Sequence, residues 1–472
     1  MPDDTIAAIA TPLGEGGLAL VRVSGPNALS IADACFVPAC KPPSRPSAAL
    51  THTLHYGHVV RDQQRVDEVL LAVMRAPRTF TREDVVEITC HGGLLPAKSV
   101  LGTVLAAGAR LAEPGEFTRR AFLNGRIDLA QAEAVADLIH ARTEVAMRAA
   151  SEQLAGKLSR RVNELREQML QALAHIEAHI DFPDEDIAPD TRQGLMTRLE
   201  RGVAFMDELL RTADEGQILR RGIRAAIIGR PNAGKSSLLN QLLGRDRAIV
   251  SAIPGTTRDT IEETANIRGL PVVFIDTAGL REARDELELE GIRRSRHSLQ
   301  NAEFLLHVLD ASEPLTEADR AYLAEFADKK CILVCNKIDL PRRLQFREAP
   351  APAPALPDAL GAPETQPRQA VEVCCLTGQG IEALKDAIKA LVWSGEIKAE
   401  MLEVMISSRH QGALQRARGA TLRALESLRT DQTLELVALD LRVAVNAIGE
   451  IVGKTATEDL LDMIFSQFCI GK

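Results

Sequence analysis

Residues 229–236 read GRPNAGKS, a complete phosphate-binding loop in the middle of the chain. The apolar run 223–228 precedes this loop and predicts a buried strand, and leucines at helical spacing follow it. In this order of strand, loop and helix, backbone N–H groups at the start of the helix can hold an anion. We therefore expect Lys235 to reach the outer phosphates of a nucleotide and Ser236 to ligate magnesium. A plain glycine-rich turn is the alternative for so short a motif.

Two further motifs follow in the order expected of a nucleotide switch. Residues 255–259 read GTTRD, and a threonine in such a loop, here Thr257, can close over the γ-phosphate and supply a second magnesium oxygen. Residues 276–279 read DTAG at the end of a strand-like run. Asp276 would then hold magnesium through water, and the Gly279 amide would face the γ-phosphate.

The motif NKID at residues 336–339 follows another predicted strand and identifies the base. The Asp339 carboxylate can accept hydrogen bonds from both N1–H and N2–H of guanine, whereas adenine lacks the 2-amino group and has an acceptor at N1. Adenine would leave a buried carboxylate unpaired, which is how a site rejects an analogue strongly. The sequence therefore predicts GTP rather than ATP.

Hydrolysis needs a group that orients the attacking water, and the usual glutamine is missing. Leu280 stands directly after the DTAG motif, close to where Ras-type enzymes place that glutamine. The following segment, 281–290, is rich in carboxylates. A solvated acidic face explains most of them, and one of them is a candidate to swing in and orient the water.

The composition limits the remaining possibilities. A chain of 472 residues is too long for one hydrophobic core, and three domains are expected. No run of about eighteen apolar residues and no basic segment at the start are present, so we expect a cytoplasmic protein without a membrane span or secretory signal. The eight cysteines are scattered without a CxxC pair, which indicates small apolar core residues for most of them.

The charge gives no support for direct nucleic-acid binding. The net charge is −9 and only 3% of residues are aromatic, so neither a general basic surface nor a set of base-stacking side chains is expected. An RNA partner would need a local basic surface or a second protein that brings it.

Hydrophobic patterns divide the chain into four segments of a multidomain protein. Residues 1–118 mix short alternating runs with turns and predict an α+β domain. Residues 119–219 and 397–472 carry apolar stripes at helical spacing and predict two helical blocks. Between them, residues 220–396 form an α/β P-loop G domain. The economical arrangement is one discontinuous helical bundle interrupted by the inserted G domain, so that a nucleotide-driven movement reaches the bundle through both connections.

Further motifs extend over essentially the whole chain. They are TFTRED at 79–84, HGG at 91–93, PGEFT at 114–118, RAFLNG at 120–125, DLAQAEA at 128–134, DFPD at 181–184 and FCIGK at 468–472. Together with the G-domain motifs, they make the chain similar to the MnmE (TrmE) family of tRNA modification GTPases.

This resemblance implies a specific role. Members of the family work with a flavoprotein partner, MnmG, to form a (carboxymethyl)aminomethyl-type group at C5 of the wobble uridine of certain tRNAs. Their N-terminal domain binds a one-carbon tetrahydrofolate derivative (5-formyl- or 5,10-methylene-tetrahydrofolate) and mediates homodimerisation, and a heterotetramer with MnmG is expected. Their G domains pair across the dimer in a potassium-dependent way, and that pairing triggers hydrolysis.

The resemblance also implies how hydrolysis is supported. A potassium ion replaces the arginine finger, and the matching ligands here are Asn232, Ser251, Ile253 and Thr256. A monovalent cation beside the phosphates neutralises developing charge as an arginine would. For Asn232, the alternative is a turn-forming asparagine after Pro231. The water-orienting carboxylate of the family matches Glu288.

For the folate site, the matching positions are Arg22, Glu87, Arg126 and Lys472. A carboxylate can pair with the 2-amino pyrimidine edge of a pterin, and cations suit the glutamate tail. Without the resemblance, Arg22 and Glu87 are merely charged residues on strands, since most exposed ion pairs are only structural. Cys469 matches the terminal cysteine of the family, which either acts in the modification chemistry or is a buried thiol.

The chain departs from the family pattern at the fifth G motif, which contacts guanine O6 through backbone amides. Cys374-Cys375-Leu376 stands there in place of a sequence such as Ser-Ala-Arg, so side-chain packing and nucleotide affinity are in question. Arg126 stands where lysine is common, and Pro254 where alanine is common. With these positions included, the expected nucleotide site comprises Asn232, Ala233, Gly234, Lys235, Ser236, Ser237, Ser251, Ala252, Ile253, Pro254, Gly255, Thr256, Thr257, Asp276, Thr277, Ala278, Gly279, Asn336, Lys337, Ile338, Asp339, Cys374, Cys375 and Leu376.

A second class of function is compatible with the G domain. The chain would then be a regulatory G protein, a nucleotide switch for ribosome or membrane assembly without one-carbon chemistry. The folate-type N-terminal domain and Cys469 favour the tRNA modification enzyme.

Overall fold

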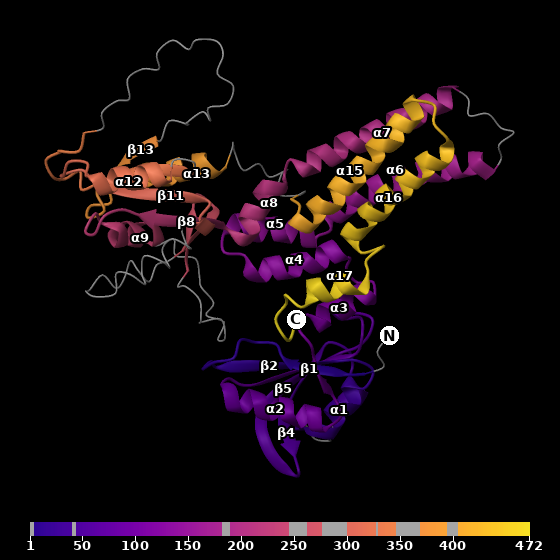
Figure 1. Cartoon of the computed structure of the whole chain (residues 1–472). Helices are drawn as coiled ribbons and strands as arrows, with labels where there is room; N and C mark the ends of the chain where they lie inside the picture. Colours follow the sequence, from indigo (N-terminus) through magenta and orange to yellow (C-terminus); the bar gives the residue numbers. More distant parts are fainter. Residues whose placement is uncertain are drawn as a thin grey trace. The chain divides into compact units, whose positions relative to one another are not determined.

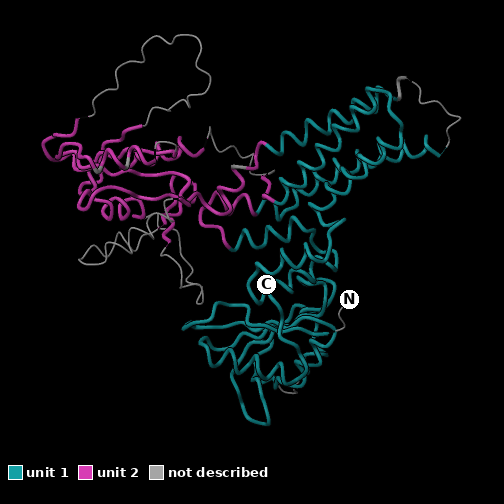
Figure 2. The backbone as a smooth tube through the Cα atoms, viewed as in Figure 1, with its two compact units in different colours: residues 1–139, 151–210, 409–472 teal, residues 140–150, 211–408 magenta. Residues whose placement is uncertain are grey.

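The computed structural model describes residues 4–39, 44–181, 189–244, 262–275, 300–326, 329–345, 369–393 and 405–472. The chain divides into two compact units (Figure 2): residues 1–139, 151–210 and 409–472 form unit 1, and residues 140–150 and 211–408 form unit 2. The N-terminal and helical segments thus share one unit, and the G-domain segment makes up most of the other. The predicted boundaries at residues 118, 219 and 396 stay predictions.

Unit 1 starts with a seven-stranded sheet in the order β3-β4-β5-β6-β2-β1-β7. Neighbouring strands are antiparallel, except that β7 runs parallel to β1. The short alternating runs expected in residues 1–118 include β2, β5 and β6. The strand bounds are β1 Ile6–Ile9, β2 Leu18–Ser24, β3 Phe36–Pro38, β4 Thr53–Arg61, β5 Gln64–Met74, β6 Val85–His91 and β7 Arg110–Leu111.

One face of this sheet packs against α1 (Ala28–Cys35) and α2 (Leu94–Ala106). Val21 and Val23 of β2 are buried in that core with Val100 of α2. Arg22 lies between the two valines, and successive strand side chains point to opposite faces of a sheet, so Arg22 points away from these helices. Arg22 pairs in register with Glu87 of β6, which places both charged groups on the same opposite face.

Four long helices form the bundle of unit 1 (Figure 1): α6 (Lys157–Asp181), α7 (Pro189–Leu210), α15 (Ser408–Arg429) and α16 (Leu434–Val452). The apolar stripes predicted on α6 and α16 pack against each other, and Val162, Met169, Leu441 and Ile448 are fully buried. The prediction that the helical blocks before and after the G domain form one bundle is therefore confirmed. Shorter helices of the chain's helical part are α3 (Glu116–Leu123), α4 (Leu129–His140), α5 (Glu144–Leu154) and α17 (Glu458–Phe465).

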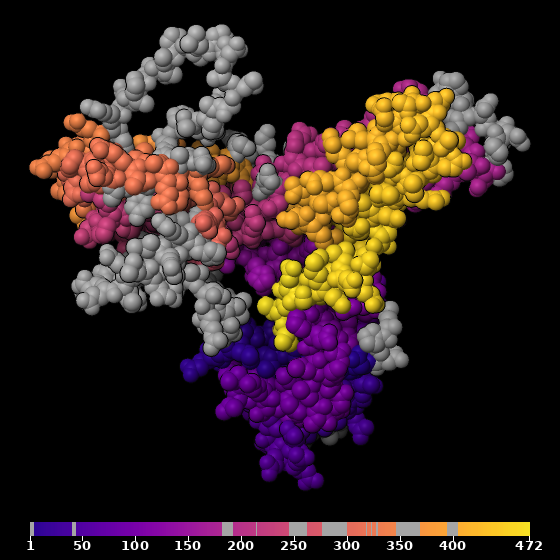
Figure 3. Space-filling view, in the orientation of Figure 1, coloured from indigo at the N-terminus to yellow at the C-terminus, as the bar shows by residue number. Residues whose placement is uncertain are grey.

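The last residues of the chain return to the N-terminal sheet. Ile470 forms an antiparallel bridge with Pro114, and the Phe117 amide donates to the Lys472 carbonyl at 3.2 Å. Gly471 has a φ of 97°, and a Cβ there would lie 2.6 Å from the Ile9 carbonyl oxygen, so this approach requires glycine. The space-filling view shows these yellow C-terminal residues against the purple N-terminal part (Figure 3).

Unit 2 is built on a six-stranded sheet in the order β13-β12-β11-β8-β10-β9. All neighbouring strands are parallel except β9, which is antiparallel to β10. Apolar clusters lie on both faces, as a parallel sheet requires. The elements are α8 Ala213–Arg221, β8 Ile223–Ile228, α9 Lys235–Leu243, β9 Glu263–Ile267, β10 Leu270–Phe274, β11 Phe304–Asp310, α12 Glu317–Glu325, β12 Lys330–Asn336, β13 Gln369–Glu372 and α13 Ile381–Val392.

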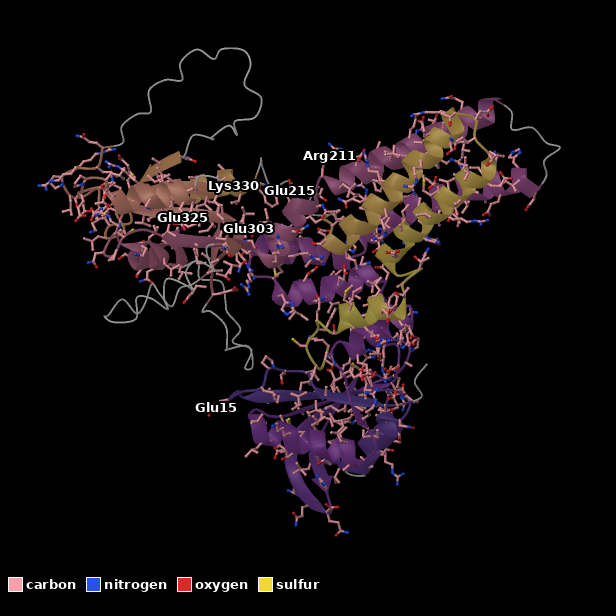
Figure 4. The ribbon with its side chains drawn as sticks, viewed as in Figure 1. Glu15, Arg211, Glu215, Glu303, Glu325 and Lys330 are labelled. Carbon is pink, nitrogen blue, oxygen red and sulfur yellow. The ribbon has the colours of Figure 1, made fainter. Side chains whose placement is uncertain are left out.

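Parallel strands bring their carboxyl ends to one edge of this sheet. The GRPNAGKS loop follows β8, the NKID motif begins at the last residue of β12, and Cys374 comes shortly after β13. Figure 4 shows Glu303 and Lys330, which lie where β11 and β12 begin, together at the other edge. Ligands of open α/β sheets bind outside the carboxyl ends, so the motif-bearing edge is the place to look for a site. Within the described parts of the chain, no helix has the length and apolar character needed to cross a bilayer.

Candidate functional site

A cavity of about 500 Å³ opens at the carboxyl edge of the unit 2 sheet. Three separate segments line it: the phosphate-binding loop with the start of α9, the NKID motif, and the loop after β13. The lining residues are Pro231, Asn232, Gly234, Lys235, Ser236, Ser237, Asn336, Lys337, Asp339, Cys374, Cys375 and Leu376. The structure thus gathers into one cavity nearly all the predicted nucleotide residues that it describes.

The backbone conformation of the phosphate-binding loop requires glycine at two positions. Gly229 has a φ of 144°, and a Cβ there would lie 2.3 Å from the Val308 carbonyl oxygen. Gly234 is the N-cap of α9 with a φ of 98°, and a Cβ there would lie 2.1 Å from Nδ2 of Asn336. Asn232 also has a positive φ, 63°, which asparagine tolerates better than most residues. The loop can therefore turn tightly and present the N-terminus of α9 to the cavity.

Lys235 is the first residue of α9 and has its ammonium inside the loop. Its Nζ donates to the carbonyl oxygens of Gly229 at 2.9 Å and Arg230 at 2.8 Å. Burial lowers the pKa of this ammonium below its ordinary value, because the charged form is poorly solvated there. A phosphate group at the mouth of the loop would offer this cation the countercharge that carbonyl oxygens supply only in part.

Asn336 ties the three segments of the cavity together. Its side chain is buried, with Nδ2 donating to the Ala233 carbonyl at 2.9 Å and Oδ1 accepting from the Cys375 amide at 3.1 Å. The Cys375 carbonyl in turn accepts from Nε2 of Gln241, on α9, at 2.7 Å. One amide side chain therefore fixes the loop after β13 relative to the phosphate-binding loop.

Lys337, the second residue of the NKID motif, is held by an ion pair. Its Nζ lies 2.6 Å from Oδ2 of Asp310, at the end of β11, and its φ is 65°. Burial would by itself raise the pKa of Asp310, but hydrogen bonds from Lys337 and Ser312 outweigh it, so the pKa lies below its ordinary value. The Asp310 carboxylate therefore stays ionised and orients the lysine stem along the cavity wall.

The predicted base-reading residue lies at the cavity mouth. Asp339 is exposed, and burial of its carboxylate beneath a bound guanine stays a prediction. It lies on the turn after β12, and a base stacked into the mouth of the cavity would cover it. The Cys374 thiol donates to Oδ1 of Asp339 at 3.2 Å, which holds the carboxylate at this place.

Two backbone amides of the fifth G motif already donate hydrogen bonds within the chain. The Cys374 amide donates to the Gln379 carbonyl at 2.9 Å, and the Cys375 amide donates to Asn336. Burial raises the pKa of the Cys375 thiol to about 11, so this group is a neutral packing residue. Leu376, whose side chain is 86% exposed, therefore carries the candidate amide for guanine O6.

Several predicted residues cannot be placed. Those outside the described residues are Ser251, Ala252, Ile253, Pro254, Gly255, Thr256, Thr257, Asp276, Thr277, Ala278, Gly279 and Glu288. Ile338 and Ala233 are described but do not line the cavity, although the Ala233 carbonyl bonds to Asn336. Across the described ranges, no cluster of three or more His, Cys, Asp or Glu residues is placed to hold a metal ion.

Sequence reasoning missed two residues that position the cavity, Asp310 and Gln241. Asp310 ends β11 next to Asn336, which ends β12, so the rule that functional residues gather at parallel strand ends could have found it. Gln241 carries no such signal, because a glutamine on an amphipathic helix usually faces solvent.

The predicted folate residues lie in unit 1, partly together. Nε of Arg22 lies 2.8 Å from Oε1 of Glu87, and both side chains are about four-fifths buried. Nη1 of Arg22 also donates to the Gly471 carbonyl at 3.4 Å, which brings the arginine beside Lys472. The terminal residues and the strand pair therefore meet at one place.

Arg126 approaches the same region from another side. Its Nη1 donates to the Thr79 carbonyl at 2.5 Å, and its guanidinium lies 5.4 Å from the centre of the Phe80 ring. The guanidinium of Arg22 lies 5.7 Å from the centre of the Phe117 ring, and Phe80 packs against the cluster that contains Phe117. Both arginines thus lie against phenylalanine rings of one apolar cluster.

Cys469 is exposed, so the alternative of a buried thiol was wrong. Its position one residue before the Pro114–Ile470 bridge leaves the side chain outside the bridge. The other described cysteines are buried, as expected of small apolar core residues.

Two family models match this chain, the "MnmE helical domain" over residues 129–469 and the "GTP-binding protein TrmE N-terminus" over residues 5–126. The chain is similar to the tRNA modification GTPase MnmE of Geobacillus kaustophilus, with 48% identity over 474 residues and 99% of each chain covered. It is similar to the same protein of Chloroflexus aurantiacus, with 49% identity over 472 residues and 100% of each chain covered.

One similar solved structure is Era in complex with MgGDPNP and nucleotides 1506–1542 of 16S ribosomal RNA. It has 27% identity and a TM-score of 0.25, and it covers 42% of this chain and 66% of that chain. A TM-score this low carries no structural argument.

Replacing Asn336 should weaken nucleotide binding through the geometry of the cavity. Asn336→Ala leaves the buried Ala233 carbonyl and Cys375 amide unpaired, at about 1–3 kcal/mol each. Asn336→Asp keeps the acceptor for Cys375 but loses the donor to Ala233. Titration with a fluorescent GDP should show a loss of affinity for both variants, and wild-type affinity in Asn336→Ala would contradict this role.

Proposed function

This chain belongs to the MnmE family of tRNA modification GTPases, and we propose that it binds GTP in the unit 2 cavity and hydrolyses it to drive the modification of tRNA. The proposal rests on the observation that Lys235 and Asp339 both line this cavity. The first residue suits phosphates and the second suits guanine. A nucleotide that satisfies both ends must carry a guanine base and at least a diphosphate.

The phosphate end of the cavity, formed by the phosphate-binding loop and the start of α9, would bind phosphates through positioned backbone amides and positive charge. Backbone N–H groups at the start of α9 and the Lys235 ammonium stabilise the phosphate oxygens, and the helix dipole adds to this field. Ser236, the next residue, lines the cavity and has the hydroxyl that would hold magnesium, together with Thr257 from outside the described residues. The bound magnesium would neutralise phosphate charge during hydrolysis.

Replacing Asp339 by asparagine should exchange the preferred base. Asparagine offers one acceptor and one donor in place of two acceptors, which no longer matches N1–H and N2–H of guanine but matches N1–H and the 2-oxygen of xanthine. Calorimetry should show GDP affinity falling on the order of 100-fold while XDP affinity rises. An unaltered preference for GDP, or ADP binding by the unchanged chain, would refute the base assignment.

The finer proposal for catalysis is that potassium replaces an arginine finger, with Glu288 orienting the water. Among the proposed ligands only Asn232 is described, and its place on the cavity wall fits a cation beside the phosphates. The others are Ser251, Ile253 and Thr256. We expect phosphate release to be slow in sodium chloride and faster in potassium chloride.

Glu288→Ala should keep GDP affinity and lower turnover in potassium. Equal rates of phosphate release in the two salts would exclude the proposed role of potassium. Unchanged turnover in Glu288→Ala would exclude the proposed role of this carboxylate.

In unit 1 we propose a site for a one-carbon tetrahydrofolate, either 5-formyl- or 5,10-methylene-tetrahydrofolate. The largely buried Arg22–Glu87 pair beside Lys472 combines a carboxylate for a pterin edge with cations for a glutamate tail. Arg126 and the neighbouring phenylalanine rings add a cation and flat apolar surface. A purely structural ion pair would need none of this surrounding chemistry.

Titration with 5-formyltetrahydrofolate should show binding by the unchanged chain that Arg22→Ala or Glu87→Ala abolishes. Arg442→Ala is the matched control, because Arg442 forms an ion pair with Glu177 within the bundle, far from the sheet in sequence. Its affinity for folate should be unchanged. Equal loss in all three variants would point to destabilisation rather than to a binding site.

For the whole reaction, we propose a cytoplasmic homodimer that works with a flavoprotein partner, MnmG, as a heterotetramer. Its product is a (carboxymethyl)aminomethyl-type group at C5 of the wobble uridine. Relatives that are named tRNA modification GTPases and are nearly half identical over the full length support this proposal. The exposed Cys469 near the proposed folate site is a candidate for the modification chemistry.

Nucleoside analysis of tRNA should test this role directly. Cells that lack the chain should lose the C5-substituted wobble uridines and regain them when the unchanged chain is supplied. A Cys469→Ser chain should fail to restore them. Full restoration by that variant would exclude the thiol, and normal nucleosides in cells without the chain would contradict the proposed function.

A further inference from the structure

Arg230 is the second residue of the phosphate-binding loop and does not line the cavity. Its side chain is 80% buried, and its guanidinium forms two ion pairs: Nε lies 3.1 Å from Oδ2 of Asp319, and Nη1 lies 3.0 Å from Oε2 of Glu313. Both partners lie at or before the start of α12, so this side chain connects the loop to a different element of the unit.

Asp319 is a firm anchor, because it is part of the cap of α12. It is 1% exposed, and its Oδ2 accepts from the Thr316 amide at 3.0 Å and from the Thr316 hydroxyl at 2.7 Å. The Asp319 amide donates back to the Thr316 hydroxyl at 3.4 Å, which completes a capping box. The helix thus fixes the carboxylate independently of the loop.

Asp319 also needs a cation. Its other oxygen, Oδ1, is buried and has no hydrogen-bond partner among the described residues. A buried carboxylate without a countercharge is strongly unfavourable, so the pair with Arg230 must stay closed for the buried charge to be tolerated. An exposed surface pair would have no such constraint.

The backbone of Arg230, in contrast to its side chain, contacts Lys235. Its carbonyl accepts from Nζ of Lys235 at 2.8 Å, and Pro231 follows it, which restricts its backbone to extended conformations. The side chain and the carbonyl belong to one residue, so fixing the guanidinium on α12 also fixes the oxygen that seats the Lys235 ammonium. The same stretch before α12 holds Lys337 through Asp310, so it supports both ends of the cavity.

We propose that the ion pair between Arg230 and Asp319 is a latch that positions the phosphate-binding loop, which makes Arg230 a positioning residue for nucleotide binding. This inference rests on the proposed function, because it assumes that the loop receives nucleotide phosphates. The latch positions the part of the cavity that receives the phosphates. Its loss therefore weakens the binding of nucleotides with a β-phosphate more than the binding of those without one, and it leaves the preference for the base unchanged.

The test compares the full-length chain with Arg230→Ala, Asp319→Asn, the double variant and Arg268→Ala, by titration with GDP, GMP and IDP. Arg268→Ala is the matched control, because Arg268 also forms two ion pairs, with Glu382 and Asp386 of α13, and none of these three residues lines the cavity. We expect each latch variant to bind GDP about tenfold more weakly, and the double variant to bind no more weakly than either single variant. The loss for GMP should be smaller, the ratio of GDP to IDP affinity should be unchanged, and Arg268→Ala should match the unchanged chain.

Three results would overturn the latch. These are GDP affinity in Arg230→Ala within twofold of the unchanged chain, additive losses in the double variant, and equal losses for GDP and GMP. Arg230→Ala decides the matter even if Asp319→Asn does not fold, and thermal unfolding identifies that case. If the unchanged chain binds no guanine nucleotide, the proposed function fails and takes the latch with it, whereas normal binding in all variants removes the latch alone.

Discussion

The cavity of unit 2 depends on the buried side chain of Asn336. A single amide joins the Ala233 carbonyl of the phosphate-binding loop to the Cys375 amide after β13. Both partners are backbone groups of turns that no sheet ladder satisfies, so losing the amide would leave them unpaired in a poorly solvated place. Two hydrogen bonds to one side chain, and not packing alone, thereby fix the distance between the phosphate-binding loop and the loop after β13.

Around this bridge, charged groups hold the flexible side chains of the cavity. Lys337 is held by Asp310 and Arg230 is held by Asp319, and each of these carboxylates belongs to the stretch between β11 and the first turn of α12. Long cationic side chains lose considerable rotamer entropy when they are ordered, and paired carboxylates reduce that cost at the moment of binding. A nucleotide would therefore meet a preorganised site at both ends.

The sequence motifs predict some residues of the site and miss others, and the difference has physical reasons. Lys235, Asp339 and the two loop glycines could be assigned from the sequence, because their roles follow from local backbone geometry and from the chemistry of one side chain. The contact of the Cys374 thiol with Asp339 could not, since it joins residues 35 positions apart that only the pairing of β12 with β13 brings together. The exposure of Asp339 could not be predicted either, because burial depends on what surrounds the turn rather than on the turn itself.

The residues alone predict the class of unit 2, the place of its phosphate-binding loop and a guanine base, since these follow from short segments whose hydrogen-bonding groups are set by neighbouring residues. The folded chain was needed to show that its final residues lie beside Arg22 and Glu87, and that α12 holds the second residue of the phosphate-binding loop. Such contacts join residues that are up to 449 positions apart, and their free energy comes from packing and charge burial that no local pattern encodes.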